Sequence, residues 1–250
     1  MLVITKCAHG RALLPEQDFE TVVDAEVAQS LRDLGAETID LLFLHRDNPV
    51  VGVDRIMEKL AEVMSSGRAR AVGASNWSYR RIDSANSAAT RSGQAPFDAV
   101  SNSLSLGRPA EPFYPNLVSA DADGEAWHRT TGIPLIPWSS QARGFFTARW
   151  PAELRDSPEG SHDAFTARML AVYGTDANYE RLRRAQHLGH GKGGYTATQV
   201  ALAWVLARPF PVAPIVGPRT LEELDSCVAA LSLDLSPTES SWLDLQSPET

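Results

Sequence analysis

The stretch IDLLFLHRDNP, residues 39–49, decides the fold because it joins a buried strand to a polar loop. Residues 41–44 form an unbroken apolar run, which is typical of a strand covered on both faces in a parallel sheet. His45 therefore stands at the carboxyl end of this strand, and Asn48-Pro49 begins the loop that follows.

The letters HRD at residues 45–47 also open the catalytic loop of protein kinases. That loop requires an Asn five residues after the Asp, and here Gly52 stands five residues after Asp47. No D-F-G follows, no G-x-G-x-x-G precedes, and no V-A-I-K strand is present. The sequence therefore excludes a protein kinase, and His45 needs another explanation.

Composition and charge indicate one ordinary globular domain. The chain has 250 residues, 43% of them hydrophobic and 22% charged, with a formal net charge of −8. An acidic balance does not favour a nucleic-acid partner, which would need a basic stripe. The longest apolar run, residues 200–207, is too short to cross a bilayer, and the first residues do not form a signal peptide. Two cysteines far apart fit a reducing compartment, so we expect a cytoplasmic protein without membrane contact.

Strand-like and helix-like segments alternate along the chain. Short apolar or β-rich runs predict strands at 2–6, 38–45, 69–75, 97–102, 133–138 and 212–217. Helical spacing and stop signals predict helices over 18–34, 53–66 and 196–207, and start signals predict two more near Thr220 and Ser236. This alternation predicts a parallel sheet in a single domain over residues 1–250, with residues 142–195 as a long loop region after the fifth strand.

Polar or aromatic residues mark the ends of these strands in a fixed order: Lys6, His45, Ser75 with Asn76, Trp138, and Gly217 with Arg219. This ordered set resembles the aldo-keto reductases, which are α/β proteins with a TIM (β/α)8 barrel that bind NADPH without a Rossmann domain. The resemblance covers nearly the whole chain. It implies an NADPH-dependent oxidoreductase that reduces an aldehyde or ketone to an alcohol by hydride transfer.

The resemblance also implies a role for each residue. Lys6 and His45 match the family's catalytic lysine and histidine. Ser75 and Asn76 match the pair that hydrogen-bonds the nicotinamide carboxamide, and Trp138 matches the ring that stacks on the nicotinamide. The remaining cofactor contacts fall on Ser139 and Gln141 near the pyrophosphate, and on Gly217 and Arg219 near the adenosine phosphate.

These residue types suit carbonyl reduction. A neutral histidine can donate a hydrogen bond to the carbonyl oxygen, and a buried lysine lowers the pKa of a neighbouring tyrosine that gives up its proton. A planar ring holds one face of the nicotinamide for hydride transfer. In barrels such groups stand at the carboxyl ends of the strands.

The family's chain normally carries two βα units before the strand that ends in the catalytic lysine, whereas here that strand begins at Leu2. Those units would carry the catalytic tyrosine and the aspartate that pairs with the lysine. We therefore expect an N-terminally truncated barrel of about six βα units, with exposed sheet edges and Lys6 without its anionic partner. The missing tyrosine puts the activity of the 250-residue chain in question.

Three positions depart from the family's pattern. Ser101 stands where a Gln usually contacts the carboxamide, and it remains a cofactor-binding candidate. Glu223 stands where several members have an Arg toward the 2′-phosphate, and Cys227 where an Asn usually meets adenine. Arg219 favours NADPH because arginine pairs well with a phosphate, whereas Glu223 leaves NADH as an alternative. The substrate also stays open, because no particular carbonyl is selected by the loop residues Asp47, Arg143, Phe145, Phe146 and Trp150.

Other hypotheses stay open beside the reductase. The missing tyrosine favours a non-catalytic, nucleotide-binding subunit or a decayed enzyme. Lys6 would instead form a Schiff base in another type of barrel enzyme. No metal site is expected, because His187 and His190 have no third ligand nearby. The stretch GHGKGG, residues 189–194, lacks the G-x-x-x-x-G-K-[ST] pattern of a phosphate loop and is predicted to connect helices. The oligomeric state is not predicted.

Overall fold

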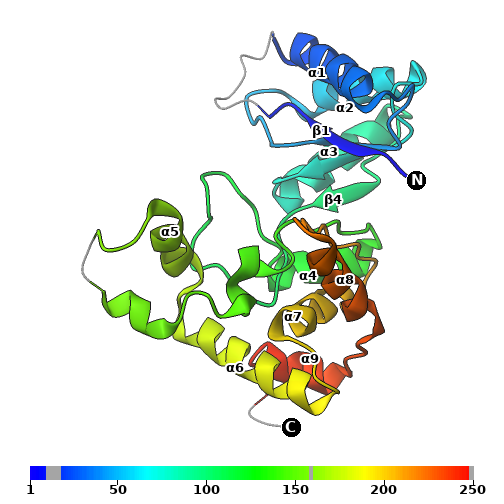
Figure 1. Cartoon of the computed structure of the whole chain (residues 1–250). Helices are drawn as coiled ribbons and strands as arrows, with labels where there is room; N and C mark the ends of the chain where they lie inside the picture. Colours follow the sequence, from blue (N-terminus) through cyan, green and yellow to red (C-terminus); the bar gives the residue numbers. More distant parts are fainter. Residues whose placement is uncertain (10–17, 158–159, 248–250) are drawn as a thin grey trace. The chain divides into compact units, whose positions relative to one another are not determined.

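The computed structural model describes residues 1–9, 18–157 and 160–247. The chain divides into two compact units, which Figure 1 colours along the sequence. Unit 1 comprises Met1–Asn102 and Ala122–Leu135, and unit 2 comprises Ser103–Asp121 and Ile136–Thr250. That the whole chain forms one domain stays a prediction.

Unit 1 is built on a parallel sheet, whose strands within the described residues are β1 (Ile4–Cys7), β2 (Leu41–Leu44), β3 (Val72–Ser75) and β4 (Ala99–Ser101), paired in that order. The register aligns Lys6 with Phe43, and Ser75 with Ser101. Because the strands are parallel, their carboxyl ends meet at one edge of the sheet. The first four predicted strands are confirmed, and their polar end residues share that edge.

Helices lie between these strands in the chain: α1 (Phe19–Leu34), α2 (Val53–Ser65) and α3 (Tyr79–Arg91). Helix α4 (Ala122–Thr131) follows β4. Helix α1 buries Phe19, Val23 and Val27, which recur at helical spacing. It ends at Gly35, whose φ of 58° is a left-handed conformation that glycine adopts without strain. The helices predicted over 18–34 and 53–66 are confirmed to within one residue at each end.

The fifth and sixth predicted strands are wrong as continuous strands. Over residues 133–138 the backbone makes isolated bridges, one between Val100 and Leu135 and one between Ser103 and Trp138. Over residues 212–217, Ile215 N donates to Pro137 O at 2.9 Å. The first segment contains Pro134 and Pro137, and the second contains Pro214 and is flanked by Pro211 and Pro218. Proline lacks the N–H group that a regular ladder requires. The two segments are apolar, as strands of a buried sheet would be, but their prolines limit them to single backbone contacts.

Unit 2 is mainly helical within its described residues. Its α-helices are α5 (Ala164–Tyr173), α6 (Asp176–Gly191), α7 (Ala197–Leu206), α8 (Leu221–Ala229) and α9 (Pro237–Leu243). Its 3-10 segments are η2 (Ala142–Thr147), η3 (Ala152–Asp156) and η4 (Ala230–Ser232). The predicted loop region over 142–195 therefore holds helices of its own, and its residues 158 and 159 lie outside the described residues. Helix α7 is buried around its whole circumference, including Val200 and Trp204, which confirms the helix predicted over 196–207.

Helices begin at both predicted positions, near Thr220 and Ser236. Ser236 and Glu239 form a capping box at the start of α9. At α8, the spacing of Thr220 and Glu223 predicts a capping box, and Thr220 accepts a hydrogen bond from Glu223 N, which is one half of it. The other half does not form, because the carboxylate of Glu223 accepts a hydrogen bond from Arg219 N at 2.6 Å instead.

The glycine-rich stretch at 189–194 closes a helix. Residues 189–191 are the last residues of α6, and Gly194 N and Tyr195 N both donate to Gly189 O at 3.0 Å. The letters also spell G-x-G-x-x-G, yet a dinucleotide-binding loop of that kind must follow a strand and open a helix. The stretch is therefore a helix end and connector, as predicted.

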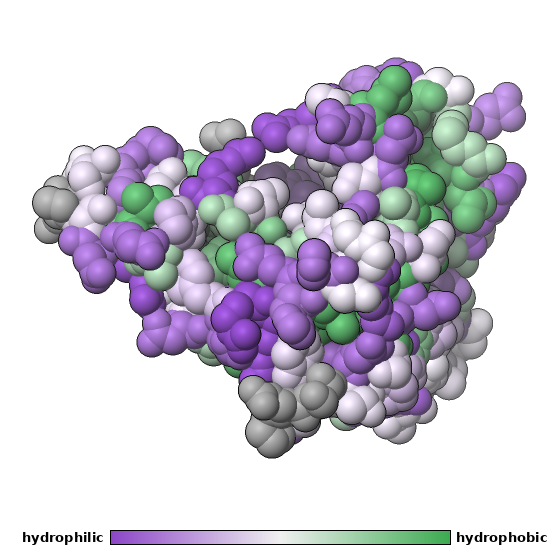
Figure 2. All heavy atoms as spheres, turned by 60° about the horizontal axis from the view of Figure 1, so that its bottom comes forward, coloured by the Kyte–Doolittle hydropathy of each residue, from purple (hydrophilic) through white to green (hydrophobic). Residues whose placement is uncertain are grey.

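No helix within the described residues is long and apolar enough to cross a bilayer. Figure 2 shows a face on which hydrophilic residues alternate with smaller hydrophobic patches. The described residues hold no group of three or more metal-ligating side chains, and His187 is exposed on α6, where its ring lies 6.1 Å from that of Trp242.

Candidate functional site

The ammonium group of Lys6 is held by hydroxyl groups. Its Nζ donates to Ser101 Oγ at 2.7 Å and to Ser75 Oγ at 3.5 Å. It also lies 4.5 Å from the centroid of the Phe43 ring, which faces Lys6 in the sheet register. Among the described residues no carboxylate lies within ion-pair distance, and burial lowers the pKa of Lys6 to about 8. This amine therefore gives up its proton more readily than an exposed lysine.

Serine and asparagine side chains extend the network around Lys6. The fully buried Ser75 donates its hydroxyl proton to Ser101 O at 2.7 Å. Asn76 Nδ2 donates to Ser75 Oγ at 3.2 Å and to His45 O at 3.1 Å. The φ of Asn76 is 60°, a left-handed conformation that asparagine tolerates better than most residues. These bonds fix the positions of the polar groups at the ends of β2, β3 and β4.

Ser101 has a different partner from the one that the family pattern implied. The sequence placed it where a glutamine contacts the carboxamide, but its short side chain is the nearest acceptor for Lys6. A glutamine would reach further from the strand end than a serine does. Ser101 therefore positions the amine directly.

His45 follows β2 and is half-buried, and its backbone N donates to Cys7 O at 2.7 Å. Burial, together with the charges of His9, Lys6 and Arg46, lowers the pKa of His45 to about 4. The imidazole is therefore neutral at pH 7, and one ring nitrogen carries a proton while the other accepts.

His9 is a residue of this region that the sequence analysis missed. Its ring centroid lies 4.2 Å from that of His45, and the ring planes are tilted by 45°. The signal for it was weak, because His9 follows Lys6 by three residues, just beyond the predicted end of the first strand. The pairing of β1 with β2 and the left-handed turn at Ala8 together bring this position close to His45.

In unit 2, Trp138, Ser139 and Gln141 follow one another in a tightly turned segment. Trp138 Nε1 is buried and has no hydrogen-bond acceptor among the described residues. Ser139 has a φ of 52°, so the chain turns sharply after the tryptophan. Gln141 Nε2 lies 3.6 Å from Cys227 Sγ in α8, so this segment contacts the helix that follows Gly217 and Arg219.

Gly217 and Arg219 lie just before α8. A Cβ atom at Gly217 would meet nothing within 4 Å, so this stretch of backbone is open. The Arg219 side chain is 74% exposed, and its Nη2 lies 3.0 Å from Glu223 Oε1. The first turn of α8 also offers backbone N–H groups, as helix N-termini generally do. Arg219 is thus accessible, but its charge is already partly matched by Glu223.

Each unit by itself offers groups that suit part of a nicotinamide dinucleotide. Ser75 and Asn76 provide hydroxyl and amide groups for a carboxamide, and the aromatic ring of Trp138 has an indole N–H that still lacks an acceptor. Open backbone at Gly217, an accessible guanidinium and a helix start suit the phosphates. The structure brings the predicted residues together in two sets: Lys6, His45, Ser75, Asn76 and Ser101 in unit 1, and Trp138, Ser139, Gln141, Gly217 and Arg219 in unit 2.

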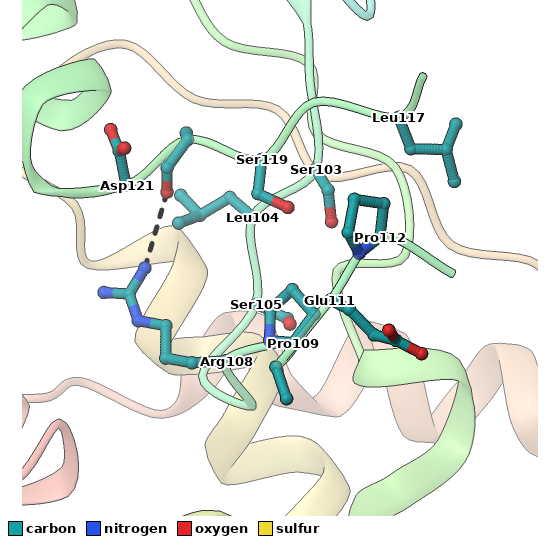
Figure 3. A pocket seen from close by; sticks show the side chains of 12 residues that line it. Ser103, Leu104, Ser105, Arg108, Pro109, Glu111, Pro112, Leu117, Ser119 and Asp121 are labelled. Carbon is teal, nitrogen blue, oxygen red and sulfur yellow. Dashed lines mark hydrogen bonds between the residues drawn. The ribbon is translucent and has the colours of Figure 1, made fainter. Parts of the chain in front are cut away.

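Unit 2 also contains a cavity of about 320 Å³ in the segment that follows β4. Figure 3 shows Ser103, Ser105 and Ser119 on its wall with prolines and leucines. Arg108 Nη1 donates a hydrogen bond to Ala120 O at 3.4 Å, next to Asp121. Arg108 is occupied by an ion pair with Asp244 at 3.0 Å. None of the predicted site residues is among those that line this cavity.

Comparison with known proteins agrees with these features. A family model described as "Aldo/keto reductase family" matches residues 1–245. The versiconal hemiacetal acetate reductase of Aspergillus parasiticus is 29% identical over 82% of this chain and 56% of its own length. The 6-dehydroglucose reductase of Agrobacterium fabrum is 25% identical over 97% of this chain and 70% of its own length.

Among solved structures, a thermostable aldo-keto reductase crystallised with the inhibitor epalrestat matches with a TM-score of 0.68 and 19% identity. The match covers 99% of this chain and 72% of that one, and it shows a common fold. The predicted α/β fold class of the TIM-barrel type is therefore confirmed. The chain spans 56% of the length of the first curated relative above, and the truncation itself stays a prediction.

Proposed function

This chain belongs to the aldo/keto reductase family, and from that premise we propose that it serves the NADPH-dependent reduction of an aldehyde or ketone to an alcohol. The observation that carries the proposal is the network at the sheet edge of unit 1. There a lysine of lowered pKa, a neutral histidine and a serine–asparagine pair are held in place by hydrogen bonds. Few structural roles require this combination of groups at one edge.

Each residue of the network has a distinct task in the proposed reaction. The neutral ring of His45 donates a hydrogen bond to the carbonyl oxygen and fixes its orientation. The ammonium group of Lys6 favours the negative charge that develops on that oxygen, and it lowers the pKa of a neighbouring acid. Ser101 and Ser75 keep Lys6 in place because their hydroxyls are its hydrogen-bond partners.

For the cofactor we propose the roles that the family resemblance implies. Ser75 and Asn76 would bind the carboxamide, Trp138 would stack on the nicotinamide, and Ser139 and Gln141 would lie along the pyrophosphate. When bound, the reduced nicotinamide supplies the hydride. Gly217 and Arg219 would contact the adenosine phosphate, where the charge of Glu223 next to Arg219 decides how far NADPH is preferred over NADH.

The test is carbonyl-dependent oxidation of NADPH, which is measured as a decrease in the absorbance of NADPH. The substrate panel should contain simple and aromatic aldehydes, ketones, and 6-dehydroglucose, which the name of one relative suggests. Lys6→Met and His45→Gln should lose most of the rate, whereas Lys192→Met on the surface of unit 2 should retain it. NADPH binding without oxidation of any of these substrates would favour the non-catalytic subunit, and no binding of NADPH or NADH would reject the proposal. A cytoplasmic location stays a prediction.

A further inference from the structure

The cavity of unit 2 is a feature that the proposed function leaves without a role. Its volume of about 320 Å³ lies within the range of small-molecule sites. All of its lining residues come from one stretch, residues 103–121, which belongs to unit 2. Leu104 and Ala120 are buried on its wall, whereas Pro112 and Asp121 are exposed at its rim. The cavity therefore has a buried floor and an opening to the solvent.

Hydrogen bonds hold the wall of this cavity in place. Ser103 N donates to Val118 O at 2.9 Å, and Ala120 N donates to Ser103 O at 2.7 Å. Ala110 N donates to Val172 O of α5 at 2.8 Å. Sites for small molecules are usually formed before the ligand arrives. These bonds give the cavity the fixed shape that such a site requires.

Two hydroxyl groups on the wall are available to a ligand. Ser103 and Ser119 form an isolated parallel bridge, so their side chains leave the backbone on the same side. Neither hydroxyl has a hydrogen-bond partner in the part of the chain that the structure describes. Ser105 differs, because its hydroxyl donates to Gly107 O at 2.6 Å. Figure 3 shows the hydroxyls of Ser103 and Ser119 side by side near Pro112.

The charged side chains of the lining favour an uncharged ligand. Arg108 pairs with Asp244 at 3.0 Å, and Glu111 pairs with Arg168. The carboxylate of Asp121 is exposed at the rim and, with that of Glu111, would repel an anion. A charge placed on the buried floor would lose its hydration without gaining a partner of opposite charge, which is costly.

We propose that this cavity binds a small uncharged aliphatic ketone or the alcohol with the same carbon frame. The leucine and proline side chains of the lining suit an aliphatic frame, and the two neighbouring hydroxyls suit an oxygen atom. A serine hydroxyl donates to a carbonyl oxygen and accepts from an alcohol, so the same two groups hold either form.

This site goes beyond the proposed function, because none of its residues belongs to the network around Lys6. It lies close to one residue of the proposed cofactor site. Ser103 also forms an isolated parallel bridge with Trp138, the ring assigned to the nicotinamide in the proposed function. The ligand would therefore bind one chain segment away from that ring.

The first test titrates the protein with cyclohexanone and with cyclohexanol, without any cofactor, and follows the backbone amide signals by NMR. Both compounds should bind saturably and shift the signals of Leu104, Ser105 and Ala120. Cyclohexanecarboxylate and cyclohexylammonium carry a charge on the same ring and should bind about tenfold more weakly or not at all. A charged ring that binds as tightly as cyclohexanol, or uncharged rings that leave these amides unshifted, would overturn the proposal.

The second test removes the hydroxyl groups. The double variant Ser103→Ala with Ser119→Ala should raise the Kd for cyclohexanol about fivefold or more, since one hydrogen bond is worth a factor of about 2–10. Ser119→Ala alone leaves the buried Ser103 in place and should raise the Kd about twofold or more. Ser232→Ala, which removes an exposed serine of η4, should leave the Kd unchanged.

Equal Kd values in the wild type and in Ser119→Ala would refute the role of the hydroxyls, even where the double variant fails to fold in a urea unfolding control. Because the titrations contain no cofactor, their outcome does not depend on whether the protein reduces a carbonyl. Binding at these amides in a protein without reductase activity would reject the proposed function alone. An active reductase whose amides at this cavity do not shift would reject the cavity site alone.

Discussion

Replacing Lys6 by methionine removes an ammonium group that the fold buries against hydroxyl groups and an aromatic ring. Burial lowers the pKa of Lys6 from 10.5 to about 8. One unit corresponds to about 1.4 kcal/mol, so the shift corresponds to roughly 3 kcal/mol in the free energy of unfolding.

The sign follows from where the proton is bound. Below about pH 8, both the folded and the unfolded chain hold the proton on Lys6. Between about pH 8 and pH 10.5, the unfolded chain binds it and the folded chain does not, so stability rises with pH over this window. Relative to Lys6→Met, the wild type should therefore gain roughly 3 kcal/mol of unfolding free energy across the window.

The assay is urea unfolding of both proteins at a series of pH values. Other groups that titrate at high pH, such as Cys7 and Tyr173 with pKa values raised to about 12, are present in both proteins and cancel in the difference. Lys59→Met is the matched control in the same unit. Burial lowers the pKa of Lys59, but hydrogen bonds to Asp24 and Glu62 raise it above the usual value overall. This control should show no such gain, and a constant difference between the wild type and Lys6→Met from pH 7 to pH 10.5 would refute the reasoning.

Three further predictions follow from single contacts. Gly73→Ala should destabilise the protein by about 1–3 kcal/mol in urea unfolding, because the new Cβ would meet the Phe43 ring and lie 2.6 Å from Ala99 O; unchanged stability would mean that the sheet yields easily there. Arg108→Met should cost about 3 kcal/mol, because it leaves the buried Asp244 with Arg181 as its one remaining ion-pair partner among the described residues, whereas Arg91→Met at the exposed pair with Asp54 should cost less than about 1 kcal/mol; equal losses in the two variants would contradict this. Glu223→Gln should raise the ratio of kcat/KM for NADPH over NADH severalfold by freeing Arg219, and a ratio that stays the same would show that Glu223 does not influence the choice of cofactor.

The sheet of unit 1 could be predicted because its strands are short apolar runs with little proline. The pattern at residues 41–44 is the clearest case, and β2 occupies those residues. The fifth and sixth segments were apolar too, but their prolines prevent a regular ladder, and apolar character alone does not reveal this. Proline positions within an apolar run therefore deserve equal weight with its hydrophobicity.

The candidate site could be predicted where a residue ends a strand and not where two segments meet. Lys6, His45 and Asn76 stand at strand ends that the sequence locates directly. The contact between His9 and His45 depends on a left-handed alanine held by Glu26, and nothing in the sequence near His9 predicts that conformation. Likewise, the Glu223 carboxylate accepts a hydrogen bond from the backbone N of Arg219 and not from that of Thr220, and a capping pattern in the sequence does not distinguish these two donors.

The central claim is that the network of Lys6, Ser75, Asn76 and Ser101 belongs to a nucleotide-binding reductase site. The most direct test is a titration of the protein with NADPH, followed by the fluorescence of the bound nicotinamide. Saturable binding to the wild type that is weakened at least tenfold by Asn76→Leu, and left unchanged by Asn86→Leu on α3, is the predicted result. Absence of saturable binding to the wild type, or equal binding by the wild type and Asn76→Leu, would contradict the account.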